Sequence, residues 1–275
     1  MAQPFTACLV THPPQLPHPD LVAVVLTLDE APEIAACVRS IAAWCPRILV
    51  LDSGSRDGTV AIARAMGAGV CIRPFDDYAS QRQAALDMVA AEWVLFVDAD
   101  ERVPRALGEE ILAVVRDGCH EDALAAARIP RSNIIMEHAM QAGGFHPDFQ
   151  LRLLRRGRVS YQEAARVHEE ARVDGRVVSL AEPLLHYNYA SWQEFHGRQR
   201  AYARLAALDA EPAPGLPLLR ILSQGWHTFR WRFVHLEGWR DGPLGLWLAL
   251  WLAWYYGCLP VLLALLRPAR EAPSG

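Results

Sequence analysis

The chain has 275 residues, of which 52% are hydrophobic and 21% are charged, and its formal net charge is −4 at pH 7. This length allows one large domain or a domain with an appendage. The acidic balance argues against a nucleic-acid-binding protein, which is usually basic. The six cysteines show neither a Cys-x-x-Cys motif nor a paired metal-binding spacing, so we expect reduced thiols in a cytosolic compartment.

The first half of the chain alternates strand-like and helix-like patterns. Residues 1–20 are rich in proline and predict a flexible leader, without the basic and apolar regions of a signal peptide. The predicted strands are residues 21–27, 48–51, 70–72 and 93–97, and the predicted helices are residues 32–44, 60–66, 78–91 and 104–116. This alternation is typical of an α/β fold with a mostly parallel sheet and crossover helices.

Polar and acidic side chains follow three of these strands at their carboxyl ends, where ligands bind in open α/β sheets. They are Thr27, Asp29 and Glu30, then Asp52 and Ser53, and finally Asp98 and Asp100. Because residues i and i+2 of an extended segment point the same way, Asp98 and Asp100 are predicted to converge on Mg²⁺ or Mn²⁺. A polar loop after a core strand is the alternative. No Gly-x-Gly-x-x-Gly follows the first strand, so the pattern favours a nucleotide-sugar site over a Rossmann dinucleotide site.

Three segments carry a resemblance to a known family. They are Thr27-Leu28-Asp29-Glu30, Asp52-Ser53-Gly54-Ser55-Arg56-Asp57-Gly58-Thr59 and Val97-Asp98-Ala99-Asp100-Glu101. Together they resemble the family 2 glycosyltransferases with a GT-A fold, in particular the subgroup that includes lipopolysaccharide-core β-glucosyltransferases. The family usually has Asn where this chain has Asp29, which leaves the contacts to the base and ribose open.

The resemblance implies roles for individual residues. It assigns donor binding to Thr27, Asp29, Glu30, Asp52, Ser53, Gln81, Arg82 and Asp98, metal binding to Asp98, Asp100 and His168, and deprotonation of the acceptor to Asp148 or, in reserve, Glu169. Arg82 on a solvated helix face, a structural Asp148 and a structural His168 are the alternatives. His186, at the end of a later strand, is expected first to pack or hydrogen bond, with donor contact as the lesser alternative.

The pattern changes to helices after about residue 190. Ser191 can cap a helix that runs to about residue 208, and prolines then mark a linker. Residues 220–240 mix arginine with tryptophan and phenylalanine, which suits a membrane interface, and an aromatic core helix is the alternative. Residues 244–266 contain no charge and are long enough to span a bilayer of about 30 Å. Gly and Pro within this run favour a monotopic or re-entrant anchor.

The sequence therefore predicts a leader over 1–20, a GT-A domain over 21–190 and C-terminal helices over 191–275 with an apolar, membrane-associating segment. The implied function is the inverting transfer of a hexose, with glucose expected, from a UDP-sugar to a lipid-linked acceptor at the cytoplasmic face of the inner membrane. A lipopolysaccharide inner-core sugar is the first acceptor hypothesis, and polyprenyl phosphate is the second. A nucleotidyltransferase and a catalytically silent membrane scaffold are the rival hypotheses.

Overall fold

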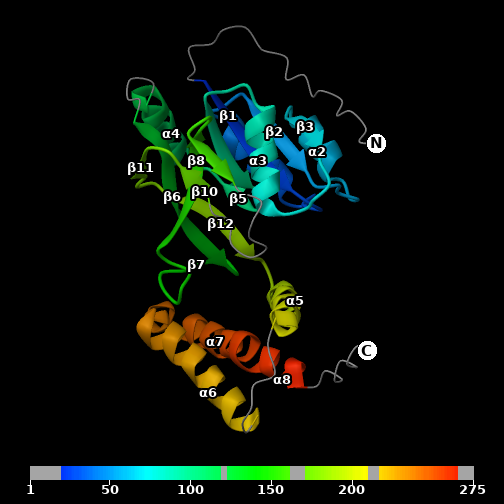
Figure 1. The fold of residues 1–275 in the computed structure, drawn as a ribbon, viewed down its shortest axis with the longest axis vertical. Helices are drawn as coiled ribbons and strands as arrows, with labels where there is room; N and C mark the ends of the chain where they lie inside the picture. The colour runs from blue at the N-terminus through cyan, green and yellow to red at the C-terminus, as the bar shows by residue number, and fades with distance from the viewer. Residues whose placement is uncertain (1–19, 119–122, 162–170, 210–216, 266–275) are drawn as a thin grey trace, which may run out of the picture. The chain divides into compact units, whose positions relative to one another are not determined.

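The computed structural model divides the chain into two compact units (Figure 1). The structure describes residues 20–118, 123–161, 171–209 and 217–265. Unit 1 comprises Met1–Arg131 and Phe149–His186, and unit 2 comprises Ser132–Asp148 and Tyr187–Gly275. The domain boundary predicted at residue 190 lies close to the last junction, and unit 2 also takes in a segment from the middle of the predicted GT-A domain.

Alternating strands and helices build the first part of unit 1. These elements are β1 (Leu21–Thr27), α1 (Ile34–Ala42), β2 (Ile48–Asp52), α2 (Thr59–Ala65), β3 (Gly69–Ile72), α3 (Tyr78–Met88), β4 (Trp93–Asp98), β5 (Glu101–Arg102) and α4 (Arg105–Gly118). β1 pairs in parallel with β2 and β4, and β2 pairs in parallel with β3. The predicted alternation is confirmed, with the short strand β5 as an addition.

Later strands extend this sheet. They are β6 (Leu124–Ile135), β7 (His138–Ala139), β8 (Asp148–Arg155), β9 (Val159–Tyr161), β10 (Ala171–Val173), β11 (Arg176–Ser179) and β12 (Leu184–Tyr189). The strand order is β3-β2-β1-β4-β8-β6-β12-β5, and β9 and β10 form a separate antiparallel pair. β4 pairs antiparallel with β8, and β5 pairs antiparallel with β12. β6, β8 and β12 each have residues in both units.

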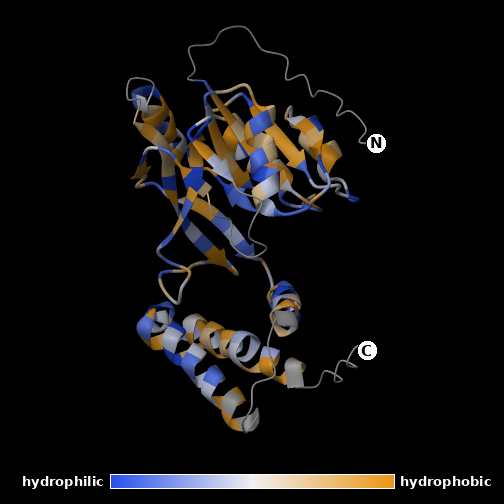
Figure 2. Cartoon of the chain, viewed as in Figure 1, coloured by the Kyte–Doolittle hydropathy of each residue, from blue (hydrophilic) through white to orange (hydrophobic). Residues whose placement is uncertain are grey.

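Both faces of the parallel part are buried, which explains the uninterrupted apolar runs of its strands. Along β1, Leu21, Ala23 and Val25 belong to the apolar cluster that includes α1 and α4. The alternate residues Val22 and Val24 belong to a second cluster with α3. Figure 2 shows these strands as hydrophobic along their length. The core therefore holds the carboxyl ends of β1, β2 and β4 in fixed register.

Helices form most of unit 2. They are α5 (Trp192–Asp209), α6 (Pro217–Arg230), η1 (Trp231–His235), η2 (Gly238–Asp241), α7 (Gly242–Leu252), η3 (Ala253–Cys258) and α8 (Leu259–Leu265), of which η1 and η3 are π-helical. The buried carboxylate of Asp241 accepts hydrogen bonds from the backbone N–H groups of Gln141 (2.8 Å) and Ala142 (3.0 Å). Gly143 N also donates to the carbonyl of Leu236 at 2.7 Å. The two chain segments of unit 2 are thus joined through backbone groups of the 132–148 segment.

Two glycines allow α6 and η3 to approach closely. A Cβ atom added to Gly257 would lie 2.8 Å from the carbonyl oxygen of Gln224 and 2.8 Å from the Cα atom of Gly225. We expect Gly257→Ala to lower the free energy of unfolding by about 1 to 3 kcal/mol, because backbone atoms must move apart. Thermal unfolding in detergent, followed by circular dichroism, measures the change.

The matched control is Gly197→Ala in α5, where an added Cβ atom meets nothing within 4 Å. Replacing this exposed helical glycine is expected to raise stability by up to about 1 kcal/mol. Equal stability of Gly257→Ala and the wild type would contradict the close crossing.

Candidate active site

The carboxyl ends of three parallel strands lie side by side at one edge of unit 1. Thr27 at the end of β1 is in register with Asp52 at the end of β2, and Leu26 is in register with Asp98 at the end of β4. Ser53 N donates to the carbonyl of Thr27 at 2.9 Å, which ties the first two strand ends together beyond the sheet. The polar residues predicted to bind the donor are thus gathered along this edge.

The loop after β2 is held by its own carboxylate. Asp52 is fully buried, and its Oδ1 atom accepts hydrogen bonds from Gly54 N (2.9 Å) and Ser55 N (2.8 Å). Its Oδ2 atom accepts a hydrogen bond from the hydroxyl of Ser55. Gly54 has a φ of +100°, which an L side chain rarely adopts. Asp52 therefore fixes the shape of the loop, and its role in donor binding stays a prediction.

The loop after β1 is fastened to the loop after β2. Asp29 N donates to Ser55 Oγ at 2.8 Å, and Arg56 N donates to Asp29 Oδ1 at 2.7 Å. Glu30 N donates to Thr59 Oγ1 at 2.8 Å. Asp29 has a left-handed φ of 55°, a conformation in which Asn and Asp are the favoured non-glycine residues. The replacement of the family's usual Asn by Asp29 therefore preserves the backbone of the site.

Two predicted donor-binding residues contact one another at the start of α3. The amide Nε2 of Gln81 donates to Ser53 Oγ at 3.1 Å and to the carbonyl of Arg73 at 3.0 Å. Among the described residues, Gln81 Oε1 and Thr27 Oγ1 are buried polar atoms without a hydrogen-bond partner. An unmet buried polar group is unfavourable, so both atoms mark this edge as a place where a ligand would supply hydrogen bonds.

A buried arginine binds the acidic cluster from an adjacent strand. The guanidinium of Arg152 in β8 donates from Nη1 to Asp98 Oδ1 at 3.2 Å, from Nη2 to Asp98 Oδ2, and from Nη2 to Glu101 Oε1 at 2.7 Å. Arg131 lies 3.6 Å from Glu101, and Arg82 lies 4.0 Å from Asp98. Burial opposes ionisation of Asp98, but Arg152 and then Arg82 outweigh it and hold the pKa of that carboxyl well below its usual range. Asp98 is therefore ionised and already paired.

The extended segment expected from Asp98 to Asp100 is not found, and the convergence of the two carboxylates on a cation stays a prediction. Ala99 and Asp100 form a turn between β4 and β5 instead of an extended segment, so the rule for residues i and i+2 does not apply. Asp98 turns to Arg152, whereas the carboxylate of Asp100 lies 3.4 Å from Nε2 of His186. The pairing of β5 with β12, which sets His186 opposite Glu101, brings the two side chains together.

Asp100 and His186 together offer donor atoms of the kinds that bind a divalent cation. Their side chains are largely buried but retain some exposure, and they offer a carboxylate oxygen and an imidazole nitrogen to one point. Carboxylate oxygen suits Mg²⁺ and Mn²⁺, and substrate phosphates complete such sites. No cluster of three or more metal-ligating side chains occurs within the described part of the chain. His168 and Glu169 lie outside the described residues.

Asp148, the predicted base, belongs to unit 2 and is half-buried. Its Oδ2 atom accepts a hydrogen bond from Nδ2 of the buried Asn133 at 3.1 Å, and the same nitrogen donates to the carbonyl of Phe145 at 2.7 Å. This contact fixes the orientation of the Asp148 carboxylate. Its role as a base stays a prediction.

Comparison with known proteins decides the family. The model of the family described as glycosyl transferase family 2 matches residues 22–155. The lipopolysaccharide core biosynthesis glycosyltransferase LpsC of Rhizobium meliloti (strain 1021) is 32% identical over 203 residues, which make up 70% of this chain and 72% of LpsC. The chain belongs to glycosyl transferase family 2. The predicted resemblance to family 2 and to lipopolysaccharide-core enzymes is confirmed, and with it the GT-A fold class of this glycosyltransferase.

Other relatives share shorter or more distant similarity with this glycosyltransferase. An uncharacterized glycosyltransferase of Rickettsia felis is 37% identical over 89 residues, or 32% of this chain and 31% of that protein. The mannosyltransferase PcManGT from Pyrobaculum calidifontis, solved in complex with GDP-Man and Mn²⁺, is 16% identical, with a TM-score of 0.48 over 91% of this chain and 76% of that chain. S. aureus TarS is 17% identical, with a TM-score of 0.46 over 80% of this chain and 45% of that chain.

Arg152 and Glu101 of this glycosyltransferase's site had no role assigned from the sequence, and His186 gains one. Arg152 interrupts an apolar run in β8, and a charge at a buried strand position is the signal that would have singled it out. Glu101 is also fully buried, within the acidic segment already noted. His186 was expected to pack or hydrogen bond, and its contact with Asp100 makes it a candidate metal ligand in addition.

Proposed function

We propose that this glycosyltransferase moves a hexose, with glucose expected, from a UDP-sugar to a lipid-linked saccharide, with inversion at the anomeric carbon. The observation that carries the proposal is the Asp100–His186 pair, together with the hydrogen-bonded loops that follow β1 and β2. Membership of family 2 favours sugar transfer over the rival nucleotidyl transfer, and similarity to LpsC favours an acceptor of the lipopolysaccharide-core class.

Each group at the edge has a part in the proposed reaction. Asp29, Glu30 and Asp52, with Ser53, Gln81 and Thr27, line the side assigned to the base and ribose. Asp100 and His186, with His168 as the sequence predicts, would hold Mg²⁺ or Mn²⁺, which neutralises the charge of a leaving diphosphate when bound. Arg152 pairs with Asp98 and keeps it ionised. Asp148, or in reserve Glu169, would accept the proton of the attacking hydroxyl.

The direct test is UDP release by detergent-extracted protein, with a panel of UDP-sugars, with and without Mn²⁺. We expect metal-dependent release from one donor, and faster release when a lipopolysaccharide-core acceptor is added. GDP-sugars serve as the control donors. Binding of no UDP-sugar, measured by calorimetry, would overturn the proposal, and an Asp148→Asn enzyme with full activity would favour polyprenyl phosphate, which is already ionised and needs no base.

The surface of unit 2 supports the proposed membrane location. Trp226, Trp231 and Trp239 are 64%, 50% and 57% exposed, within a segment that also carries several arginines. Within the described residues, Gly238–Leu263 is the one stretch long and apolar enough to cross a membrane, and 44% of its apolar 18-residue window is buried inside the protein. A helix with one face packed on protein and the other exposed fits monotopic attachment at the cytoplasmic face.

Substitution of the exposed tryptophans tests this attachment. We expect the full chain to float with vesicles that contain anionic lipid, and the double variant Trp226→Gln/Trp231→Gln to bind them about tenfold or more weakly, because two apolar side chains no longer enter the interface. Vesicle flotation measures the bound fraction.

The control for the tryptophan variants is Tyr78→Gln, which removes a 59% exposed aromatic side chain from unit 1. It should leave flotation unchanged. Equal losses in Tyr78→Gln and the double variant would argue against a specific membrane surface on unit 2.

A further inference from the structure

Unit 2 contains a half-buried arginine that has no carboxylate partner among the described residues. Arg232 lies in η1, and Nη1 of its guanidinium donates a hydrogen bond to the carbonyl of Gly143 at 3.0 Å. The guanidinium carbon lies 5.8 Å from the ring centre of Phe145 and 5.6 Å from that of Tyr256. Burial lowers the pKa of Arg232, and nearby tyrosines offset only part of this effect. A cation removed from water without an anion is unfavourable, so an anionic partner is expected.

Part of this guanidinium is open to the surface. The bond to Gly143 is the only hydrogen bond of the Arg232 side chain within the described part of the chain. Neither Nε nor Nη2 is among the buried polar atoms that lack a partner, so both nitrogens reach the surface of unit 2. An added Cβ atom at Gly144 would lie 3.2 Å from Nη1, which shows that this glycine leaves room for the guanidinium. Two donor atoms are therefore available to a ligand that approaches from outside.

Arg232 and Tyr256 bring the two π-helical segments of unit 2 together. Arg232 belongs to η1 and Tyr256 belongs to η3. Tyr256 is exposed, and its hydroxyl makes no hydrogen bond with a described residue, so it adds a further donor next to the guanidinium. Segments of π-helix are rare and often occur at functional sites. A guanidinium fork with a neighbouring hydroxyl suits the oxygen atoms of a phosphate group.

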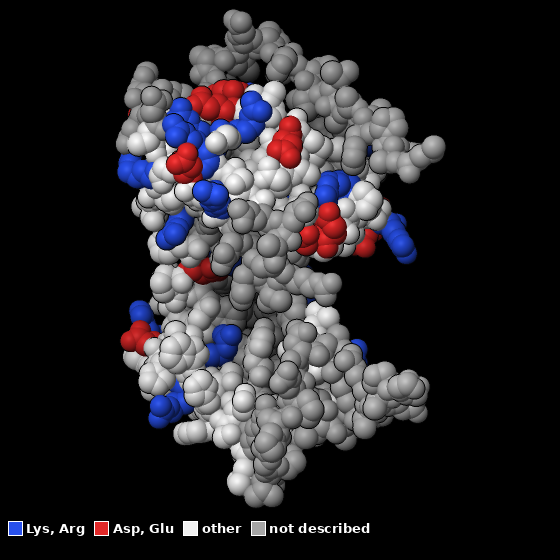
Figure 3. Space-filling view, in the orientation of Figure 1, with Lys and Arg blue, Asp and Glu red and all other residues white. Residues whose placement is uncertain are grey.

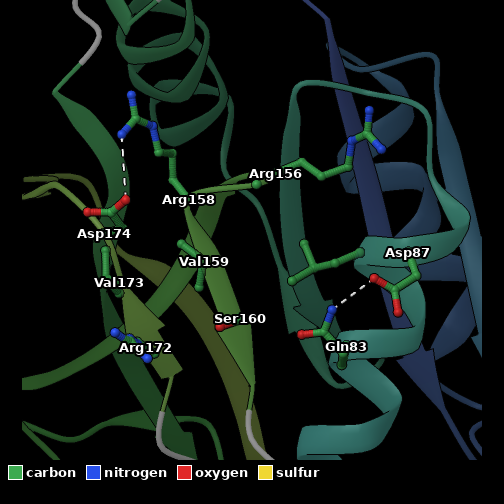
Figure 4. A pocket seen from close by; sticks show the side chains of 11 residues that line it. Gln83, Asp87, Arg156, Arg158, Val159, Ser160, Arg172, Val173 and Asp174 are labelled. Atoms are coloured by element: carbon green, nitrogen blue, oxygen red, sulfur yellow. Dashed lines mark hydrogen bonds and ion pairs between the residues drawn. The ribbon is translucent and has the colours of Figure 1, made fainter.

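The arginines beside the largest cavity described in unit 1 differ in this respect. That cavity has a volume of about 720 Å³ and lies between α3 and the β9–β10 pair (Figure 4). Arg158 pairs with Asp174 at 3.7 Å, and Nε of Arg156 donates to the carbonyl of Ala91 at 3.1 Å. The cavity beside Arg232 has a volume of only about 10 Å³, which is room for one water molecule. A larger anion must therefore reach Arg232 from the surface of unit 2.

The surface of α6 and η1 is apolar with an excess of positive charge. Leu222, Trp226, Trp231 and Val234 are large exposed apolar side chains of these two elements. Residues 217–241 contain four arginines and two acidic residues. On the face of unit 2 that is visible in Figure 3, uncharged side chains surround a few arginines. Such a surface favours an amphipathic anion, whose charged group meets arginine while its apolar part meets the exposed side chains.

We propose that Arg232 and Tyr256 bind the phosphate headgroup of an anionic membrane lipid. The lipid supplies the negative charge that the guanidinium lacks, and Nε and Nη2 donate to its phosphate oxygens. The acyl chains would lie along the exposed apolar side chains of α6 and η1. The proposal rests on the proposed attachment of unit 2 to the membrane and adds a specific lipid site to it.

Vesicle flotation of the full chain tests the site with two kinds of vesicle. One contains phosphatidylcholine alone, whose choline group neutralises the phosphate, and the other also contains phosphatidylglycerol. At about 0.5 M salt, which screens exposed charges, we expect the wild type to bind the phosphatidylglycerol vesicles about tenfold or more tightly. Arg232→Gln should lose this preference and keep its binding to phosphatidylcholine. Arg232→Lys should keep part of the preference, because it keeps the charge.

Arg230→Gln is the matched control, because it removes an exposed arginine of α6 from the same surface. It should keep the wild-type preference. A second measurement uses the wild type alone, in case Arg232→Gln does not fold. Dihexanoyl phosphatidylglycerol, kept below its micelle-forming concentration, should raise the midpoint of thermal unfolding in detergent, because a ligand of the folded state stabilises it. Inorganic phosphate at the same concentration should not.

The outcomes separate the lipid site from membrane attachment. Flotation with neither kind of vesicle would overturn the attachment and the lipid site together. Equal binding of the wild type to both kinds of vesicle would leave the attachment in place and overturn the site alone. Loss of the preference in Arg230→Gln would overturn the site in favour of exposed surface charge. Equal stabilisation by inorganic phosphate would overturn it and assign Arg232 to a free anion.

Discussion

Replacing Arg152 by methionine is expected to lower the free energy of unfolding by about 3 kcal/mol or more, because two neighbouring carboxylates lose their shared buried cation. Asp98 and Glu101 both accept hydrogen bonds from this guanidinium, and Arg152 and Glu101 are almost fully buried. Arg82 and Arg131, at 4.0 and 3.6 Å from the same carboxylates, offset part of the loss. Urea unfolding followed by circular dichroism measures the effect.

Arg105→Met is the matched control, because Arg105 is 89% exposed and pairs with Glu109 on the surface of α4. Its expected effect is about 0.5 kcal/mol or less. The double variant Arg152→Met/Glu101→Gln should recover part of the stability, since one of the uncompensated charges is removed. Equal losses in the two single arginine variants would show that the buried ion pairs do not hold the strand ends together.

Replacing Asp100 by asparagine is expected to lower the turnover of the UDP-sugar by about 1,000-fold or more, a loss typical of removing charge stabilisation at the reacting centre. The amide keeps the size of the side chain but removes the negative charge offered to the cation beside His186. The Mn²⁺ concentration needed for half-maximal activity should rise as well. Initial rates over a metal titration measure both effects.

His186→Gln tests the other half of the pair and is expected to show the same rise in metal requirement. Asp117→Asn, at an exposed position of α4, is the control and should keep wild-type activity. An Asp100→Asn enzyme that retained a tenth of its activity with an unchanged metal requirement would rule out Asp100 as a ligand.

The sequence was sufficient for the parallel part of the fold because its signals are local. The buried runs of β1 and β4 have no polar interruption, and α1 buries one face, with apolar residues at helical spacing. The polar residues after these strands therefore could be placed on one edge from the sequence, and the register of Thr27 with Asp52 agrees with that placement. The family resemblance could also be recognised from the sequence, because short contiguous motifs carry it.

The partners of Asp98 and Asp100 could not be predicted from the sequence, because they lie far away in the chain. Arg152 meets Asp98 across 54 positions, and His186 reaches Asp100 only because β12 pairs with β5. The chain turns at Ala99 and Asp100, so the rule for extended segments does not apply to Asp98 and Asp100. Unit 2 takes in residues 132–148, and nothing local in the sequence marks this segment as a partner of helices that follow much later.

The composition of unit 2 from two chain segments limits how this enzyme can be shortened. A soluble catalytic fragment ending near residue 190 would keep the 132–148 segment but delete Asp241 and Leu236, which satisfy the backbone groups of Gln141, Ala142 and Gly143. Those amides would face water or a neighbouring molecule, beside the stripped apolar contacts of Ile135 and Met140. Such a fragment would expose backbone groups and apolar side chains of the 132–148 segment that could associate with other molecules. The helices after residue 190 therefore protect this segment from aggregation. Expression work on the enzyme should therefore retain both halves and solubilise them with detergent.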